Sequence, residues 1–227
     1  MRTIKKVASH IFIDGFGGMT QGLFATLIIG TMIQQIGLLI GGSTGNVIYL
    51  LGKAAAALTS AGIGVGVAVK YGESPLVTVS AAVAAMVGGY AGKITGGTFF
   101  VDGNAVLAGP GEPLGAFIAA FAGITCGHLV SGKTKVDIIV TPVITIGAGS
   151  VVGLLVGPPI SQMMTGLGSI INWATEQRPF IMGIVVSVVM GMVLTLPISS
   201  AALGIILNLS GPVSYTHLRA HETGAYL

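Results

Sequence analysis

The densest group of polar side chains in the sequence lies in residues 172–180, just before a long apolar run. It combines the amide of Asn172, the indole of Trp173, the hydroxyl of Thr175 and the carboxylate of Glu176. Carboxylates and amides bond the hydroxyls of a carbohydrate, and an aromatic ring stacks on the apolar face of a sugar. The segment therefore predicts contacts to a sugar. The alternative is an interfacial belt, with Trp173 at the lipid headgroups and Glu176 paired with the neighbouring arginine in water.

A second candidate is Glu112, which stands between two prolines and among three glycines in the loop 109–115. The prolines exclude a helix interior there. Two interpretations remain open at this point. The loop is either a gate or re-entrant tip that exposes backbone amides and Glu112 to a polar solute, or an ordinary extracytoplasmic turn.

Other chemical motifs are weaker. Residues 127–134 match the phosphate-binding pattern G-x-x-x-x-G-K-T, but the match closes an apolar run instead of following a buried strand, so we interpret it as a glycine helix stop followed by cytoplasmic lysines. Cys126 and His128 are predicted to be helix-packing residues rather than ligands. The single cysteine excludes an internal disulfide, and no catalytic triad or metal-binding histidine pair is visible, so we expect no cofactor and no self-contained enzyme.

The composition indicates that these groups are held by membrane helices. Of 227 residues, 52% are hydrophobic, 37 are glycine and only 7% are charged, whereas about a quarter of a soluble domain is charged. Most of the surface must therefore face lipid. The net charge of +3 comes from scattered residues without a basic face, which argues against nucleic acid as a partner.

Six apolar stretches are long enough to cross or enter a bilayer, which takes about 20 helical residues. We therefore predict an all-α, polytopic transmembrane protein with about six apolar segments. The third and fourth are short and rich in glycine, so each is either a tilted span, a half-helix or a re-entrant hairpin. The predicted segments are Gly18–Ile40, Val47–Val69, Pro75–Gly92, Leu114–Val130, Ile138–Val156 and Phe180–Leu207, the last with Pro197 inside it.

The two ends of the chain differ from this pattern. Residues 1–16 have the spacing of an interfacial amphipathic helix, and residues 17–211 form the membrane domain. Residues 212–227 resemble the translation of a transposase sequencing adapter, so we expect them to be an artefact that truncates the natural protein after Gly211; the alternative is an ordinary polar tail. The excess of Lys and Arg at the N-terminus and in alternate loops predicts a cytoplasmic N-terminus.

Several strings together resemble a known family. They are residues 22–31, 109–120, 129–142, 157–160 and the long string ATEQRPFIMGIVVSVVMGMVLTLPISSAA at 174–202. These resemble a branch of the membrane IIC components of bacterial phosphotransferase systems, which includes toxin regulators of the perfringolysin regulator type. The resemblance covers the chain from about Phe12 to Leu209. Members continue into further helices, which agrees with the predicted truncation.

The resemblance implies a sugar-conducting subunit of a phosphoenolpyruvate-dependent system in the bacterial inner membrane. A carbohydrate would be its substrate, a separate phosphorylated IIB protein would donate the phosphoryl group, and homodimers are common in the family. Related proteins carry a Thr-Glu-Pro signature whose glutamate bonds the sugar; here Thr175-Glu176 is followed by proline only at Pro179. The predicted substrate contacts are Glu176, Thr175, Asn172 and Glu112. The alternative function is a membrane regulator or sensor that kept the fold without transport.

Overall fold

The computed structural model describes residues 14–101, 104–107, 109–175 and the positions 183, 184, 187, 188 and 191. These residues are helical apart from loops and two very short strands, which confirms the predicted all-α class. The chain divides into two compact units, Met1–Ile160 and Ser161–Leu227. Most of the predicted N-terminal amphipathic segment 1–16 and the whole predicted tail 212–227 lie outside the described residues.

The first membrane-length element is continuous but not uniform. It runs through α2 (Phe16–Leu23), the π-helix η2 (Phe24–Ile28) and α3 (Ile29–Ile40), 25 mostly apolar residues in all. At about 1.5 Å per residue this is longer than the 30 Å core of a bilayer, as predicted for Gly18–Ile40. Gly41 and Gly42 then adopt positive φ angles of 66° and 63°, which turn the chain back.

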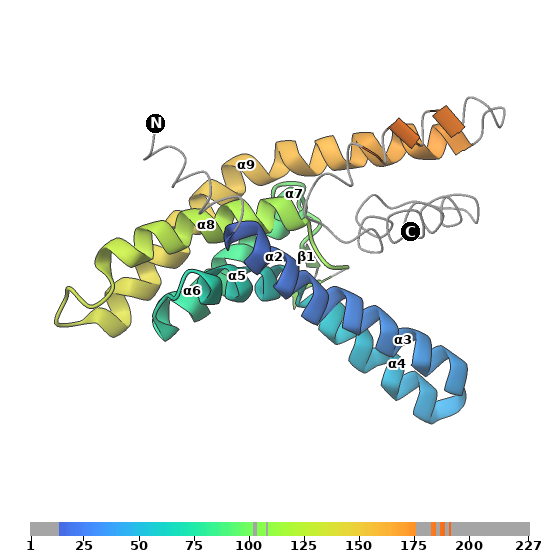
Figure 1. The fold of residues 1–227 in the computed structure, drawn as a ribbon, viewed down its shortest axis with the longest axis horizontal. Helices are drawn as coiled ribbons and strands as arrows, with labels where there is room; N and C mark the ends of the chain where they lie inside the picture. Colours follow the sequence, from blue (N-terminus) through green and yellow to red (C-terminus); the bar gives the residue numbers. More distant parts are fainter. Residues whose placement is uncertain are drawn as a thin grey trace. The chain divides into compact units, whose positions relative to one another are not determined.

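The returning element is broken. Helices α4 (Gly42–Ala57) and α5 (Thr59–Lys70) meet at Leu58 with a bend of 53°. α3 packs on α4 and α2 packs on α5, so the two elements run as an antiparallel pair through the bend (Figure 1). Gly18 allows this approach, because a Cβ there would come within 2.7 Å of the Cα of Val67.

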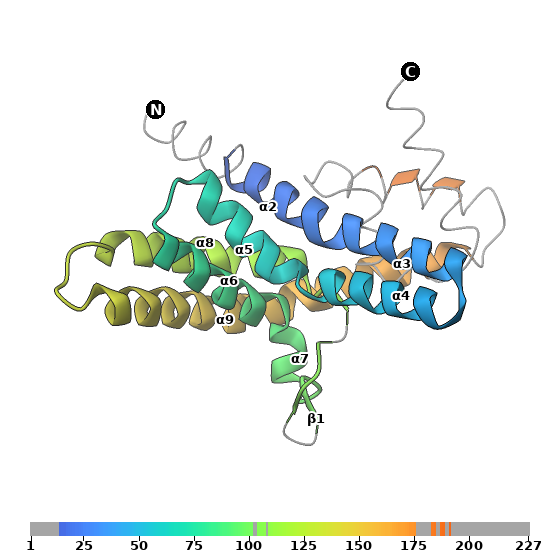
Figure 2. The same ribbon diagram turned by 90° about the horizontal axis from the view of Figure 1, so that it is seen from below.

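Two short helices follow. α6 (Pro75–Gly89) begins with Ser74 as its N-cap and a proline in its first turn, and it ends at Tyr90. α7 (Ala91–Thr95) leads to the antiparallel strands β1 (Phe100–Val101) and β2 (Asn104–Ala105). Figure 2 shows this small hairpin projecting from the helices.

One further helix and the first part of another complete the first unit. α8 (Pro113–Val130) packs against α5 and α6. α9 (Asp137–Thr175) returns beside α8 and α6: a Cβ on Gly123 would come within 2.7 Å of the Thr145 carbonyl oxygen, and one on Gly153 within 2.8 Å of Gly88. Small residues thus let these helices approach closely in lipid.

The structure corrects two predicted boundaries. The stretch Val47–Val69 was expected to be one run, but Leu58 divides it because its backbone leaves the helical region (φ −85°, ψ 9°). The stretch Ile138–Val156 was expected to end before the Gly-Pro-Pro sequence, but α9 continues to Thr175. Pro158 and Pro159 remove two amide donors without ending the helix, as membrane helices tolerate. Most of the predicted segment Phe180–Leu207 lies outside the described residues.

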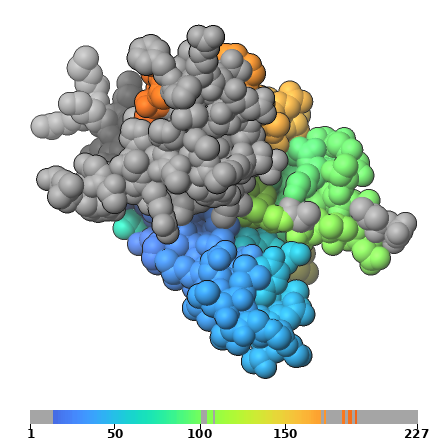
Figure 3. Space-filling view, turned by 90° about the vertical axis from the view of Figure 1, so that its right-hand side faces the viewer, coloured from blue at the N-terminus to red at the C-terminus, as the bar shows by residue number. Residues whose placement is uncertain are grey.

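Within the described residues, three helices are long and apolar enough to cross a membrane, or four if α4 and α5 count as one broken span. The pair α3–α4 extends beyond the contacts with α2 and α5, and its end stands clear in the space-filling view (Figure 3). Leu39 on α3 is 86% exposed and Leu51 on α4 is 62% exposed. Such apolar surface agrees with an integral membrane protein.

Candidate functional site

Three interruptions of helices meet inside the first unit. They are the bend between α4 and α5 (Ala57–Ser60), the end of α6 (Gly89 and Tyr90), and the loop before α8 (Gly109–Glu112). We call this set of residues the helix-break junction. Each interruption leaves backbone groups without helical partners, so the junction concentrates polar atoms among apolar helices.

The three interruptions satisfy one another by long-range hydrogen bonds. The Ser60 hydroxyl donates to the Pro110 carbonyl oxygen at 3.0 Å, and the Glu112 amide donates to the Gly89 carbonyl oxygen at 2.7 Å. The Tyr90 hydroxyl lies between the carbonyl oxygens of Gly109 and Ala57, the latter at 3.2 Å. The Tyr90 side chain is 1% exposed. The loop before α8 is therefore fixed against the bend of the broken pair α4–α5.

Glu112 is the N-cap of α8. Its Oε1 accepts from the amide of Leu114 at 3.1 Å, and its Oε2 accepts from the amide of Gly115. A carboxylate at this position also faces the positive end of the helix dipole. Two of the amides that the gate interpretation would expose to a solute, those of Leu114 and Gly115, are thus capped by Glu112. A carboxylate has about four lone-pair sites, so Glu112 keeps acceptor capacity for a further ligand.

The residue types of the loop explain how it packs closely against α5 and the end of α6. Gly111 has a positive φ of 75°, and a Cβ at this position would lie 2.5 Å from the Ser60 Oγ. Only glycine meets both conditions without strain. Pro113, in the first turn of α8, fixes the helix start directly after the Glu112 cap.

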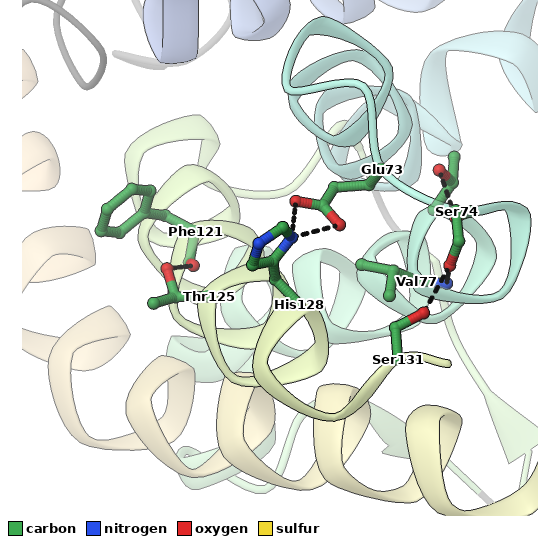
Figure 4. A network of polar contacts seen from close by, with 8 residues as sticks. Glu73, Ser74, Val77, Phe121, Thr125, His128 and Ser131 are labelled. Atoms are coloured by element: carbon green, nitrogen blue, oxygen red, sulfur yellow. Dashed lines mark hydrogen bonds and ion pairs between the residues drawn. The ribbon is translucent and has the colours of Figure 1, made fainter. Parts of the chain in front are cut away.

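A second polar cluster lies at the opposite ends of the same helices. We call it the turn end: the turn 71–74 between α5 and α6 with the last turn of α8 and the loop 131–136. The Nδ1 of His128 lies 3.0 and 3.2 Å from the two carboxylate oxygens of Glu73 (Figure 4). The hydroxyls of Ser74 and Ser131 are 3.0 Å apart. Burial, together with the charge of Asp14, raises the pKa of Tyr71 in this turn to about 12.

The structure of the turn end tests two predictions. α8 ends at Val130 and Gly132 has a positive φ of 74°, so the residues 127–134 form a helix stop, as predicted. The prediction that His128 packs between helices is wrong, because its side chain is 71% exposed and contacts Glu73. Among the described residues no group of three or more His, Cys, Asp or Glu side chains is placed to hold a metal ion.

The predicted sugar-contacting residues fall in different parts of the chain. Glu112 lies in the junction of the first unit. Asn172 and Thr175 belong to the end of α9 in the second unit, where their side chains are outside the described residues, and Glu176 is wholly outside them. Their role in binding stays a prediction. Ser60 and Tyr90 are site residues that the sequence did not predict, although a tyrosine that follows two glycines at the end of an apolar run indicates a polar group at a helix end.

A family model matches most of the chain. The model described as phosphotransferase system, EIIC, matches residues 13–216. The chain belongs to this EIIC family. No curated protein and no solved structure matches the chain. The match confirms the family that the sequence resembles, and it covers both the helix-break junction and the polar segment 172–180. An EIIC protein is a membrane component of a sugar phosphotransferase system and a subunit of a transporter.

Proposed function

We propose that this EIIC protein is the sugar-conducting subunit of a phosphoenolpyruvate-dependent system in the bacterial inner membrane. It binds a carbohydrate and changes the side from which the sugar is accessible, and a separate phosphorylated IIB protein supplies the phosphoryl group. The observation that carries the proposal is the family match over residues 13–216.

The helix-break junction supports this proposal by its place along the helices. α5 has 12 residues, about 18 Å of helix, and is too short to cross a hydrocarbon core of about 30 Å. If the turn end lies at the membrane surface, the bend at Leu58 lies inside the bilayer. Irregular backbone at that depth is tolerated where it is enclosed by protein or lines a cavity. Transporters commonly place substrate beside such interrupted helices and helix N-termini.

The orientation that fits this proposal places the turn end in the cytoplasm. Lys70, Lys133 and Lys135 belong to this end and are exposed, which agrees with the excess of basic residues in cytoplasmic loops. Lys93, in α7, then faces the outside. Its ammonium lies 5.3 Å from the centre of the Tyr90 ring, and burial lowers its pKa.

We propose Glu176, Thr175, Asn172 and Glu112 as the polar contacts of the sugar. Each carboxylate accepts from a sugar hydroxyl, and such a charged hydrogen bond contributes about 1.5–3 kcal/mol. Losing one therefore weakens sugar binding about tenfold or more.

The test is uptake of radiolabelled hexoses and disaccharides by bacteria that lack their own sugar-specific EIIC proteins but keep the general phosphoryl carriers and their IIB proteins. Wild-type protein should accumulate sugar phosphate, and Glu176→Gln should lower uptake at least tenfold with unchanged membrane insertion. Glu222→Gln, in the predicted tail, is the matched control and should leave uptake unchanged. Insertion without uptake of any tested sugar contradicts the proposal and favours a regulator that kept the fold.

A further inference from the structure

We propose that one face of α3 is the surface through which two copies of this chain associate in the membrane. The face consists of four residues at the spacing i, i+3, i+4 and i+7, which we call the α3 stripe: Met32, Gln35, Ile36 and Leu39. Helices that pack side by side by inserting side chains between one another show this spacing. The inference goes beyond sugar transport, since the stripe belongs neither to the helix-break junction nor to the turn end.

The α3 stripe points away from the helix on which α3 packs. Gly30 and Gly37 face α4, because a Cβ on either would come within 2.8 Å of a backbone nitrogen of α4. Met32 and Leu39 each follow one of these glycines by two positions, which is about 200° round the helix. Met32 is 53% exposed and Ile36 is 51% exposed, on the end of the pair α3–α4 that stands clear in Figure 3. The stripe is therefore open to another molecule.

Gln35 distinguishes this face from ordinary lipid-facing surface. It is exposed, and it stands six residues before the turn at Gly41, which is about 9 Å of helix. If that turn lies at the membrane surface, the amide lies in the apolar layer, where a polar group without a partner is costly. The adjacent Gln34 packs on α4, because a Cβ on Gly52 would come within 2.9 Å of its Cγ. In the described part of the chain the Gln35 side chain makes no hydrogen bond.

The chemistry of the stripe fits a second copy of itself. A two-fold axis places a residue opposite the same residue of the partner, so the surface must be self-complementary. A glutamine amide carries both a donor and an acceptor, and two such amides form a pair of reciprocal hydrogen bonds. The stripe carries no charge that would repel its copy, because Lys53, the one charged residue in the sequence from 29 to 57, belongs to α4. Such amide contacts between apolar helices promote association in lipid.

The first experiment is disulfide cross-linking of the full chain in bacterial membranes, in a Cys126→Ser background. Single cysteines replace the stripe residues one at a time, and an oxidant joins cysteines that face each other across the interface. Gln35→Cys should give several times more covalent dimer than Leu38→Cys, a control on the same helix that is 62% exposed but lies outside the stripe. No dimer from any stripe position, or an equal yield from Leu38→Cys, overturns the inference. A cross-link to a protein of different mass also overturns it.

The second experiment measures energy transfer between separately labelled copies in liposomes of phosphatidylethanolamine and phosphatidylglycerol. Gln35→Leu inserts a more apolar side chain and should therefore enter the membrane normally, but it should raise the dissociation constant of the dimer about threefold or more. Leu38→Ala should associate like the wild type. A wild-type chain without energy transfer, or an unchanged Gln35→Leu chain, contradicts the inference. Neither measurement needs a sugar or a IIB protein, so a failure of the transport proposal and a failure of this inference are distinguishable.

Discussion

The helix-break junction and the turn end lie at opposite ends of α5, α6 and α8, and they treat their polar groups differently. At the junction the hydroxyls of Ser60 and Tyr90 are buried and donate to carbonyl oxygens distant in sequence. At the turn end the Ser74–Ser131 pair is partly buried and His128 is exposed. Water reaches the exposed groups of the turn end more readily than the buried hydroxyls of Ser60 and Tyr90. Equivalent substitutions should therefore cost much more free energy at the junction.

The single cysteine provides a common measurement. Cys126 lies on α8 between the two regions and is only partly exposed. A thiol-reactive fluorophore therefore reports thermal unfolding of this helix in detergent. The same assay compares the stability of variants at the junction with that of variants elsewhere.

The largest effect is expected from Gly111→Ala. Its positive φ of 75° costs an alanine about 1 kcal/mol, and the new Cβ would also lie 2.5 Å from the Ser60 Oγ and 3.1 Å from the Gly89 carbonyl oxygen. We expect a total loss of about 3 kcal/mol. Gly132→Ala is the control at the turn end: its φ is 74°, but no atom lies within 4 Å of the new Cβ, so it should lose only about 1 kcal/mol. Equal losses would show that packing at the junction is not tight.

Tyr90→Phe should have the next largest effect. It keeps the buried ring but removes the hydroxyl that donates to the Gly109 carbonyl oxygen, so the end of α6 loses its hydrogen bond to the loop before α8. We expect a loss of about 2 kcal/mol. Tyr49→Phe on α4 is the control, because the Tyr49 hydroxyl makes no hydrogen bond in the described part of the chain. A Tyr90→Phe protein as stable as this control would remove the hydroxyl from the account of the junction.

The same contrast explains what the sequence could predict. Apolar runs and the proline-flanked starts of α6 and α8 are local signals, and they located these helices within a few residues. The bend at Leu58 has no glycine or proline of its own, and it is stabilised by contacts from residues about 50 positions away, such as Pro110. No local pattern contains that information. Glu112 was found because a carboxylate among prolines is conspicuous, whereas its use as a helix cap depends on its side-chain geometry.

A third, smaller difference is expected between the caps of α8 and α6. Glu112→Ala removes acceptors from two amides, those of Leu114 and Gly115, and should lose about 1.5 kcal/mol. Ser74→Ala removes one weaker cap bond, 3.4 Å from the Val77 amide, and should lose about 0.5 kcal/mol. Glu112→Gln, which keeps one acceptor oxygen, should lie between these values. The opposite order would mean that the Glu112 carboxylate is destabilising in its half-buried place.

The smallest effect is expected from Ser131→Ala at the turn end. The variant removes the partner of the Ser74 hydroxyl, at 3.0 Å in the wild type, but leaves Ser74 as the cap of α6. Gly132 and Lys133, which follow Ser131 directly, are exposed. Water can therefore take the place of the lost hydroxyl. Thermal unfolding should therefore show a loss of about 0.5 kcal/mol or less. A loss as large as that of Tyr90→Phe would show that the turn end excludes water like the junction, and the distinction between the two ends of α5, α6 and α8 would fail.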